Sequence, residues 1–178
     1  MVNKILDWVK RKIYSCEAYA RARGVKIGKG CSIATRMFGS EPYLVEIGDN
    51  VQITNDVRFF THGGGWVFRH KDPEFDSFGK IKIHDNVYIG NGTMILPGVI
   101  IGNNVVIGAG SIVTKSIPDN VVVAGNPARI VCTIDDFFVK ANRYNVKTKQ
   151  MGPNEKRAYL LSLEDEHFMR KDFLLFKK

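Results

Sequence analysis

The stretch IHDNVYIGNGTMILPGVIIGNNVVIGAGSIV, residues 83–113, carries a six-residue repeat. Every sixth residue is Ile or Val, and no spacing in this run departs from six. The full set of these anchor residues is Ile27, Ile33, Ile47, Ile53, Ile83, Ile89, Ile95, Ile101, Ile107 and Val113. Neither the period of an α-helix nor the alternation of a simple strand produces this spacing. A fixed period of this kind predicts a solenoid of stacked β-coils.

A second position recurs four residues after most anchors and holds small or β-branched side chains. Its members are Cys31, Val51, Val57, Val87, Thr93, Val99, Val105 and Ser111. We expect one anchor on each side of a triangular coil to point inward and stack on the next coil. The second position then lies where the interior narrows at a corner. Gly often follows the anchor, and Asn or Asp often comes next, which we attribute to strained turn conformations.

The 178 residues are enough for one domain with a sizeable core. We expect a mainly β domain over residues 1–178, divided into an N-terminal helix (1–24), a parallel β-helix (25–131) and a helical tail (132–178). Pro118–Arg129 is expected to be a loop. In the tail, helices are expected over Ile134–Ala141 and Glu155–Phe176, with Gly152 and Pro153 between them.

Several classes of protein are disfavoured by composition. No apolar run approaches the length of a membrane span, and the N-terminus lacks the pattern of a signal peptide. The three cysteines form no CxxC pair, which argues against a disulfide framework. We therefore expect a cytoplasmic protein.

The formal net charge is +8, and basic residues gather outside the coils. Residues 1–23 are expected to form an amphipathic helix with the apolar stripe Val2, Ile5, Leu6, Val9 and Ile13. This helix could cap the open end of the solenoid or dock on an anionic membrane surface. Nucleic-acid binding is disfavoured, because the basic residues are not interleaved with aromatic ones on a strand platform.

The repeat lapses over residues 61–80, which begin THGGGWVFRH (61–70), and then resumes in phase. A solenoid that interrupts itself in this way has extruded a loop. Such loops on rigid scaffolds commonly form binding and catalytic sites. The three glycines admit a ligand close to the backbone, and Trp66 and Phe68 offer an apolar wall.

Two further segments carry a family resemblance: NVYIGNGTMILPGVIIGNNVVIGAGSIVTKSIPDN (86–120) and VVAGNPARI (122–130). They resemble the hexapeptide-repeat O-acetyltransferases, whose fold is a left-handed parallel β-helix. The loop THGGGWVF (61–68) is similar to the subgroup that acetylates precursors of bacterial capsular or cell-surface polysaccharides. The resemblance covers roughly residues 25–131. It implies acetyl-CoA as the acyl donor, a saccharide acceptor, a homotrimer with active sites between adjacent subunits, and no metal.

The resemblance also assigns roles to residues. His62 corresponds to the catalytic histidine, and imidazole, with an ordinary pKa near ~6.5, can accept a hydroxyl proton at neutral pH. A backbone N–H near Gly90 or Asn91 is the expected oxyanion donor. The expected donor-binding residues are Gly90, Asn91, Gly108, Ala109, Thr114, Lys115 and Arg129. The last two are the expected contacts of the CoA phosphates.

The acceptor side is less defined. Asn55, Trp66 and Arg69 are candidates for binding hydroxyls, stacking on a sugar face or meeting an acidic saccharide. Relatives often place an acidic residue after the catalytic histidine, but this chain has Gly63. What orients His62 is therefore left open, as are the sugar and the hydroxyl that is modified.

Three other functions remain alternatives. One is an antibiotic O-acetyltransferase of similar build, and another is a non-catalytic scaffold. The third is a carbonic-anhydrase-like metalloprotein, which needs three converging histidines. The candidates in this region are His62, His70 and His84, and their positions in the repeat make convergence improbable.

Overall fold

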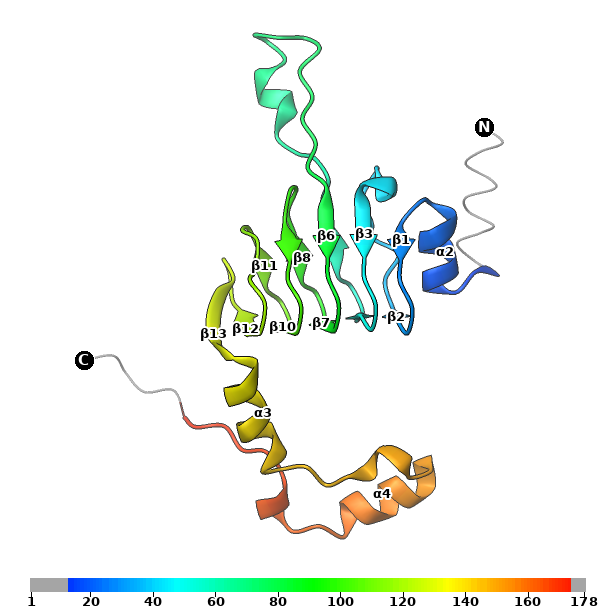
Figure 1. The fold of residues 1–178 in the computed structure, drawn as a ribbon, viewed down its shortest axis with the longest axis vertical. Helices are drawn as coiled ribbons and strands as arrows, with labels where there is room; N and C mark the ends of the chain where they lie inside the picture. Colours follow the sequence, from blue (N-terminus) through cyan, green and yellow to red (C-terminus); the bar gives the residue numbers. More distant parts are fainter. Residues whose placement is uncertain (1–12, 174–178) are drawn as a thin grey trace, which may run out of the picture. The chain divides into compact units, whose positions relative to one another are not determined.

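The computed structural model describes residues 13–173. It groups into two compact units, Met1–Ile134 and Asp135–Lys178. The boundary lies close to the one expected between the coils and the helical tail. Within the described part of the first unit, helix α2 (Cys16–Ala22) is followed by a stack of flat coils (Figure 1).

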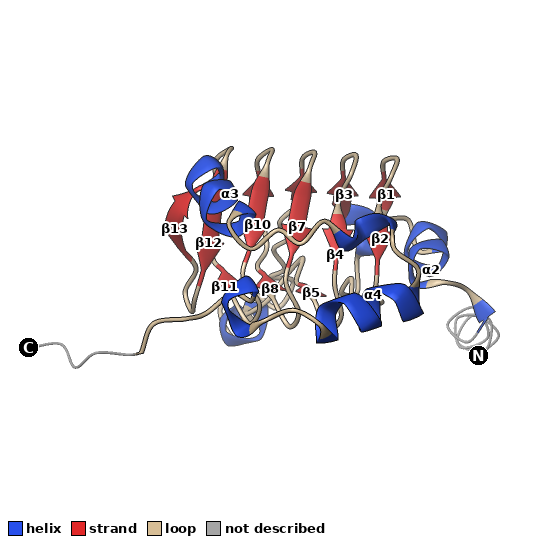
Figure 2. Ribbon diagram, turned by 90° about the horizontal axis from the view of Figure 1, so that it is seen from below, coloured by secondary structure: helices blue, strands red, loops and turns tan. Residues whose placement is uncertain are grey.

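Three sheets form the sides of the coiled stack, and successive coils lie side by side in Figure 2. One sheet has the order β1 (Lys26–Ile27), β3 (Val45–Ile47), β6 (Ile81–Ile83) and β9 (Ile100–Ile101). A second has the order β2 (Ser32–Ile33), β4 (Gln52–Ile53), β7 (Val87–Ile89), β10 (Val105–Ile107), β12 (Val121–Ala124) and β13 (Arg129–Thr133). The third has the order β5 (Arg58–Phe59), β8 (Met94–Ile95) and β11 (Ile112–Val113). We call these the A, B and C sheets.

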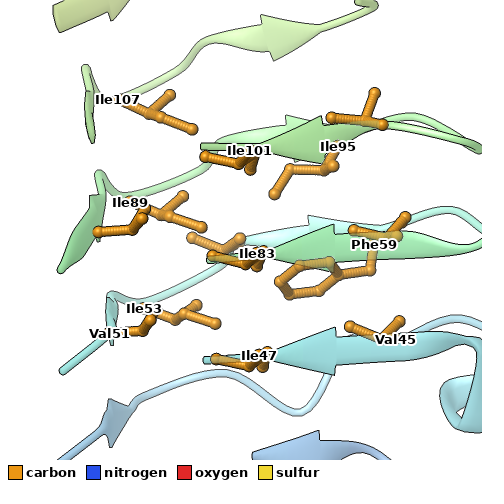
Figure 3. Packing of buried hydrophobic residues seen from close by; sticks show 14 of the residues in the cluster. Val45, Ile47, Val51, Ile53, Phe59, Ile83, Ile89, Ile95, Ile101 and Ile107 are labelled. Atoms are coloured by element: carbon orange, nitrogen blue, oxygen red, sulfur yellow. The ribbon is translucent and has the colours of Figure 1, made fainter. Parts of the chain in front are cut away.

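The six-residue period is the reason for this register. Anchors pair with anchors from coil to coil: Ile47 with Ile83 on the A sheet, for example, and Ile95 with Val113 on the C sheet. Their side chains point into the interior and stack (Figure 3), where Ile53, Ile89, Ile95, Ile101 and Ile107 are fully buried. Burying one such side chain contributes about 1.5–3 kcal/mol. The expected parallel β-helix is therefore the observed architecture of the first unit.

Phe59 continues the anchor series although it is not aliphatic. It is buried six residues after Ile53 and pairs with Ile95. Its ring stacks on that of Phe38, with 4.8 Å between ring centroids. An aromatic pair thus fills the coil interior beneath the loop.

The expectation that the glycine after each anchor serves a strained turn conformation is wrong. The positive φ occurs three residues after the anchor, at Asn50, Asp56, Asn86, Asn104, Gly30, Gly92, Gly98 and Gly110, and recurs at Asn120 beyond the last anchor. The glycine directly after the anchor has another cause, because the next coil leaves it no room. A Cβ placed on Gly90 would lie 2.5 Å from the Ala109 nitrogen.

The prediction of one continuous helix over residues 1–24 is wrong within the described residues, 13–24. Ser15 is extended, with φ −57° and ψ 161°, and its Oγ accepts a hydrogen bond from the Ala18 N–H at 3.2 Å. It is therefore an N-cap that starts a separate helix. Helix α2 packs on β2 and buries Tyr19 and Ala20, so it covers the end of the coils. The predicted membrane-docking stripe, apart from Ile13, lies outside the described residues.

Beyond Pro118 the expected loop is also wrong, since β12 extends the B sheet and β13 returns antiparallel to it. In the second unit, α3 (Ile134–Asn142) matches its prediction, whereas α4 (Pro153–Leu161) ends well before Phe176. Acidic residues 164–166 disfavour a continued helix, because they would face the negative end of its dipole. None of the helices within residues 13–173 has the length and apolar character needed to cross a bilayer.

Candidate active site at the base of the extruded loop

The loop over residues 61–80 leaves and rejoins the coils through a narrow base (Figure 1). At this base the Gly79 N–H donates to the Thr61 carbonyl at 2.7 Å, and His62 bridges Phe78 in antiparallel fashion. Thr61 is buried, so the loop starts from a fixed point of the scaffold. The outer part of the loop contains a short 3-10 helix, Gly65–Phe68.

His62 is held at this base by a carboxylate. Its Nδ1 lies 2.7 Å from Glu41 Oε2, and the same oxygen accepts a 2.6 Å hydrogen bond from Thr61 Oγ1. The ring also contacts the Phe78 ring edge-on, with centroids 5.5 Å apart. The His62 side chain is 41% exposed and that of Glu41 is 16% exposed. One face of the imidazole is thus supported by protein while the other remains accessible.

The Thr61 hydroxyl lowers the pKa of Glu41 below its ordinary value, and His62 acts in the same direction. A carboxylate only accepts hydrogen bonds, so neutral His62 carries its proton on Nδ1. Nε2 is then the free lone pair of the ring. This is the tautomer that a general base facing solvent requires.

Glu41 is a candidate site residue that the sequence pattern did not predict. It lies just before the 3-10 helix Pro42–Leu44, within the segment 37–43 that breaks the repeat register. In relatives the acidic partner often directly follows the catalytic histidine, where this chain has Gly63. One sequence feature could have indicated Glu41. It is an acidic residue within a second break of the repeat, 21 residues before His62.

A pocket of about 540 Å³ opens beside His62. Its lining comprises Met37, Gly39, Ser40, Arg58, Phe59, Phe60, Thr61 and His62. The three acceptor candidates from the sequence do not line it. Trp66 is 82% exposed in the outer loop, with the Arg69 guanidinium 5.8 Å from the centre of its ring, and Asn55 lies at another corner of the coil.

The small residues expected to bind the donor share one corner, between the B and C sheets. Gly90 and Asn91 follow β7, and Gly108 and Ala109 follow β10 on the next coil. Asn55 occupies the equivalent turn after β4, and its carbonyl accepts from the Gly92 N–H at 3.0 Å. The Gly90 N–H already donates to the Ile107 carbonyl at 2.9 Å, so Gly90 is not the oxyanion donor. Asn91 stays the candidate for that role.

The remaining donor candidates lie elsewhere. Thr114 and Lys115 are exposed at the corner between the C and A sheets, two coils beyond His62 on the same corner. Arg129 begins β13 and is exposed. The two corners are separated by the width of the C sheet. From Gly92 to Pro97 this is about 16 Å, at ~3.3 Å per residue.

Within residues 13–173, no group of three His, Cys, Asp or Glu side chains could hold a metal ion. His70 has its Nδ1 2.7 Å from the Val67 carbonyl in the outer loop, and His84 lies in the turn after β6. The three histidines considered for a zinc site are therefore not brought together.

The model for the bacterial transferase hexapeptide, six repeats, matches residues 80–115. Protein CapG of Staphylococcus aureus is 48% identical over 166 residues, which cover 91% of this chain and 95% of that protein. A galactoside acetyltransferase solved in complex with coenzyme A is 30% identical, with a TM-score of 0.53, over 69% of this chain and 72% of its own. The chain belongs to the hexapeptide-repeat O-acetyltransferases.

A maltose O-acetyltransferase from Clostridium difficile 630 supports the same membership. It is 37% identical, with a TM-score of 0.57, over 62% of this chain and 59% of its own. The hexapeptide-repeat O-acetyltransferases have coils of left-handed sense, so membership implies this handedness for the parallel β-helix described above.

Proposed function

We propose that this protein transfers the acetyl group of acetyl-CoA to a hydroxyl of a saccharide in the biosynthesis of a surface polysaccharide, with His62 as general base. The observation that carries the proposal is the His62–Glu41 pair, 2.7 Å apart, at the edge of the 540 Å³ pocket. Family membership supplies the reaction class. Two of the relatives reported above are a maltose O-acetyltransferase and a galactoside acetyltransferase, and the second is solved with coenzyme A.

In the proposed reaction, Nε2 of His62 takes the proton of the acceptor hydroxyl as its oxygen attacks the thioester carbon. The C–O bond forms, and the carbonyl oxygen becomes an oxyanion that the Asn91 N–H stabilises. The intermediate then collapses with cleavage of the C–S bond, and the departing thiolate receives the proton from His62. Glu41 stays ionised and stabilises the imidazolium between these two steps.

The donor is proposed to bind along the corner between the B and C sheets, where Gly108 and Ala109 admit the pantetheine arm. Lys115, on the same corner as His62, and Arg129 are proposed to meet its phosphates where two copies adjoin, and Thr114 lies beside Lys115. His62 is on a different corner from Asn91 within one chain. A second copy is therefore proposed to bring its own glycine-lined corner to this His62, and a closed trimer repeats the arrangement at every site.

The test is acetyl-CoA-dependent thiol release over a panel of saccharide acceptors, with chloramphenicol and a streptogramin included. We expect turnover with saccharides alone. His62→Ala should lower kcat by about 10² or more while the affinity for acetyl-CoA changes little, because the base acts in the transition state. His70→Ala is the matched control, since His70 does not line the pocket. A His62→Ala protein that keeps more than a tenth of the wild-type kcat would overturn the assignment.

A further inference from the structure

One cation lines the pocket beside His62 and has no role in the reaction proposed above. Arg58 lies on β5, with its side chain exposed on the outer side of the C sheet. Its neighbours in the backbone pairing are Met37 on one side and Met94 on the other. The residues paired beside Arg58 are therefore two methionines, and neither carries a charge.

No carboxylate in residues 13–173 forms an ion pair with Arg58. Glu41, which reaches the same pocket region, is committed to Thr61 and His62. Asp56, two residues earlier, lies in the turn before β5. A free guanidinium in a pocket that also holds a base and apolar walls is an arrangement for binding an anionic ligand.

We infer that Arg58 binds an oxyanion group of the acceptor, so that the acceptor is an acidic saccharide that carries a carboxylate or a phosphate. The inference rests on the proposed function. The planar guanidinium matches the two oxygens of either group in a bidentate fashion. Phe60 and Met37, each 37% exposed, line the same pocket and offer the apolar surface on which the C–H face of a pyranose packs.

The phosphates of CoA are not the partner of Arg58. His62 and Arg58 line one pocket of about 540 Å³, so the Arg58 side chain borders the space in which the reacting hydroxyl is proposed to lie. The whole pantetheine arm separates the thioester from the diphosphate of CoA. A donor with its thioester at His62 therefore places its phosphates outside this pocket, whereas an acidic group on the acceptor ring itself can reach Arg58.

The experiment compares acidic sugars with neutral sugars that have the same ring: methyl glucuronide with methyl glucoside, and glucose 1-phosphate with glucose. Their dissociation constants are measured by ligand-observed NMR on the full-length protein saturated with CoA, and thiol release is measured in parallel. We expect at least one acidic member to bind tenfold or more tightly than its neutral partner, as a charge-assisted contact of about 1.5–3 kcal/mol gives. Arg58→Gln should abolish this preference, and Arg58→Lys should keep part of it.

Arg157→Gln is the matched control, because Arg157 is an exposed arginine on α4 in the other compact unit. It should leave the preference unchanged, and Arg58→Gln should leave the KM for acetyl-CoA within about twofold. Equal binding of charged and neutral ligands, or failure of every acidic probe to bind, overturns the inference. So does a preference that survives in Arg58→Gln, or a raised KM for acetyl-CoA in that variant.

The two proposals fail separately. Thiol release that shows no preference for acidic acceptors keeps the acetyltransferase function and overturns the role of Arg58. Charge-dependent binding that Arg58→Gln abolishes, without thiol release from any acceptor, supports the role of Arg58 and overturns the proposed reaction.

Discussion

The proposed chemistry depends on two side chains that are distant in sequence. His62 lies at the first residue after the buried Thr61, and Glu41 reaches it from the preceding coil. Thr61 donates to the same carboxylate oxygen, so the three groups fix one another. The imidazole is thus pre-oriented before an acceptor binds, which is what a positioned base requires.

Glu41→Gln tests this orientation. Its amide can present an N–H to Nδ1, which favours the tautomer with the proton on Nε2, the wrong one for a base. We expect kcat to fall at least tenfold, and up to about 10⁴-fold, with little change in the KM for acetyl-CoA. Glu46→Gln, on the exposed outer side of β3, serves as the control and should remain near wild type. An unchanged kcat in Glu41→Gln would mean that Glu41 does not position the base.

The lowered pKa of Glu41 also predicts how stability depends on pH. Because the folded state favours the ionised carboxylate, its stabilising contribution is present above the ordinary value of 4.5 and is lost as pH falls through the lowered pKa. The Tm of the wild type should therefore exceed that of Glu41→Gln most at neutral pH, and the difference should shrink as the pH falls below the ordinary value of 4.5. A difference that stays constant over this range would contradict the linkage.

At the scale of single residues, the sequence indicated His62 but not its partner. His62 could be predicted because the repeat stops at Thr61 and the segment after it resembles a family loop. For Glu41 the sequence offers only its place in the register break over residues 37–43, because an irregular segment brings it to His62 and no period relates the two positions. Arg58 was missed for a similar reason, since its place on a strand marked it only as an outward-facing residue.

At the scale of elements, the spacing between coils imposes its own constraint on sequence. A Cβ on Gly48 would lie 2.9 Å from the His84 carbonyl carbon in the next coil, and backbone cannot move aside there without breaking the ladder. Gly48→Ala should lower the free energy of unfolding by about 1–3 kcal/mol. Gly63→Ala is the matched control, because nothing lies within 4 Å of that Cβ. Chemical denaturation of both variants provides the measurement, and equal stability would refute the spacing argument.

The coils were the most predictable elements, because each anchor reports both burial and register. The segments before the first coil and after the last coil were predicted less well. Ser15 interrupts the N-terminal helical pattern through a local hydrogen bond to Ala18, which the periodicity of apolar residues does not reveal. Pro118 and Gly125 led to the prediction of a loop in place of β12 and β13. In the structure Pro118 precedes β12 and Gly125 follows it, so neither residue interrupts a strand.

At the scale of the whole molecule, the candidate site is divided between corners. His62 and the pocket lie where the C sheet meets the A sheet, while Asn91 and Ala109 lie where it meets the B sheet. The stacked anchor side chains fill the coil interior, so a substrate cannot pass through it from one corner to the other. A neighbouring copy that supplies the second corner makes a complete site, and the expected assembly is a homotrimer.

The most direct test of this account mixes two inactive proteins. His62→Ala lacks the base but keeps the glycine-lined corner, and Ala109→Trp blocks that corner but keeps the base. After denaturation and joint refolding, random assembly should pair an intact base with a neighbour's intact corner at about a quarter of the sites. We predict that acetyl-CoA turnover returns to about this fraction of the wild-type rate. Mixed trimers that stay inactive, or a fully active monomer by light scattering, would contradict the shared site.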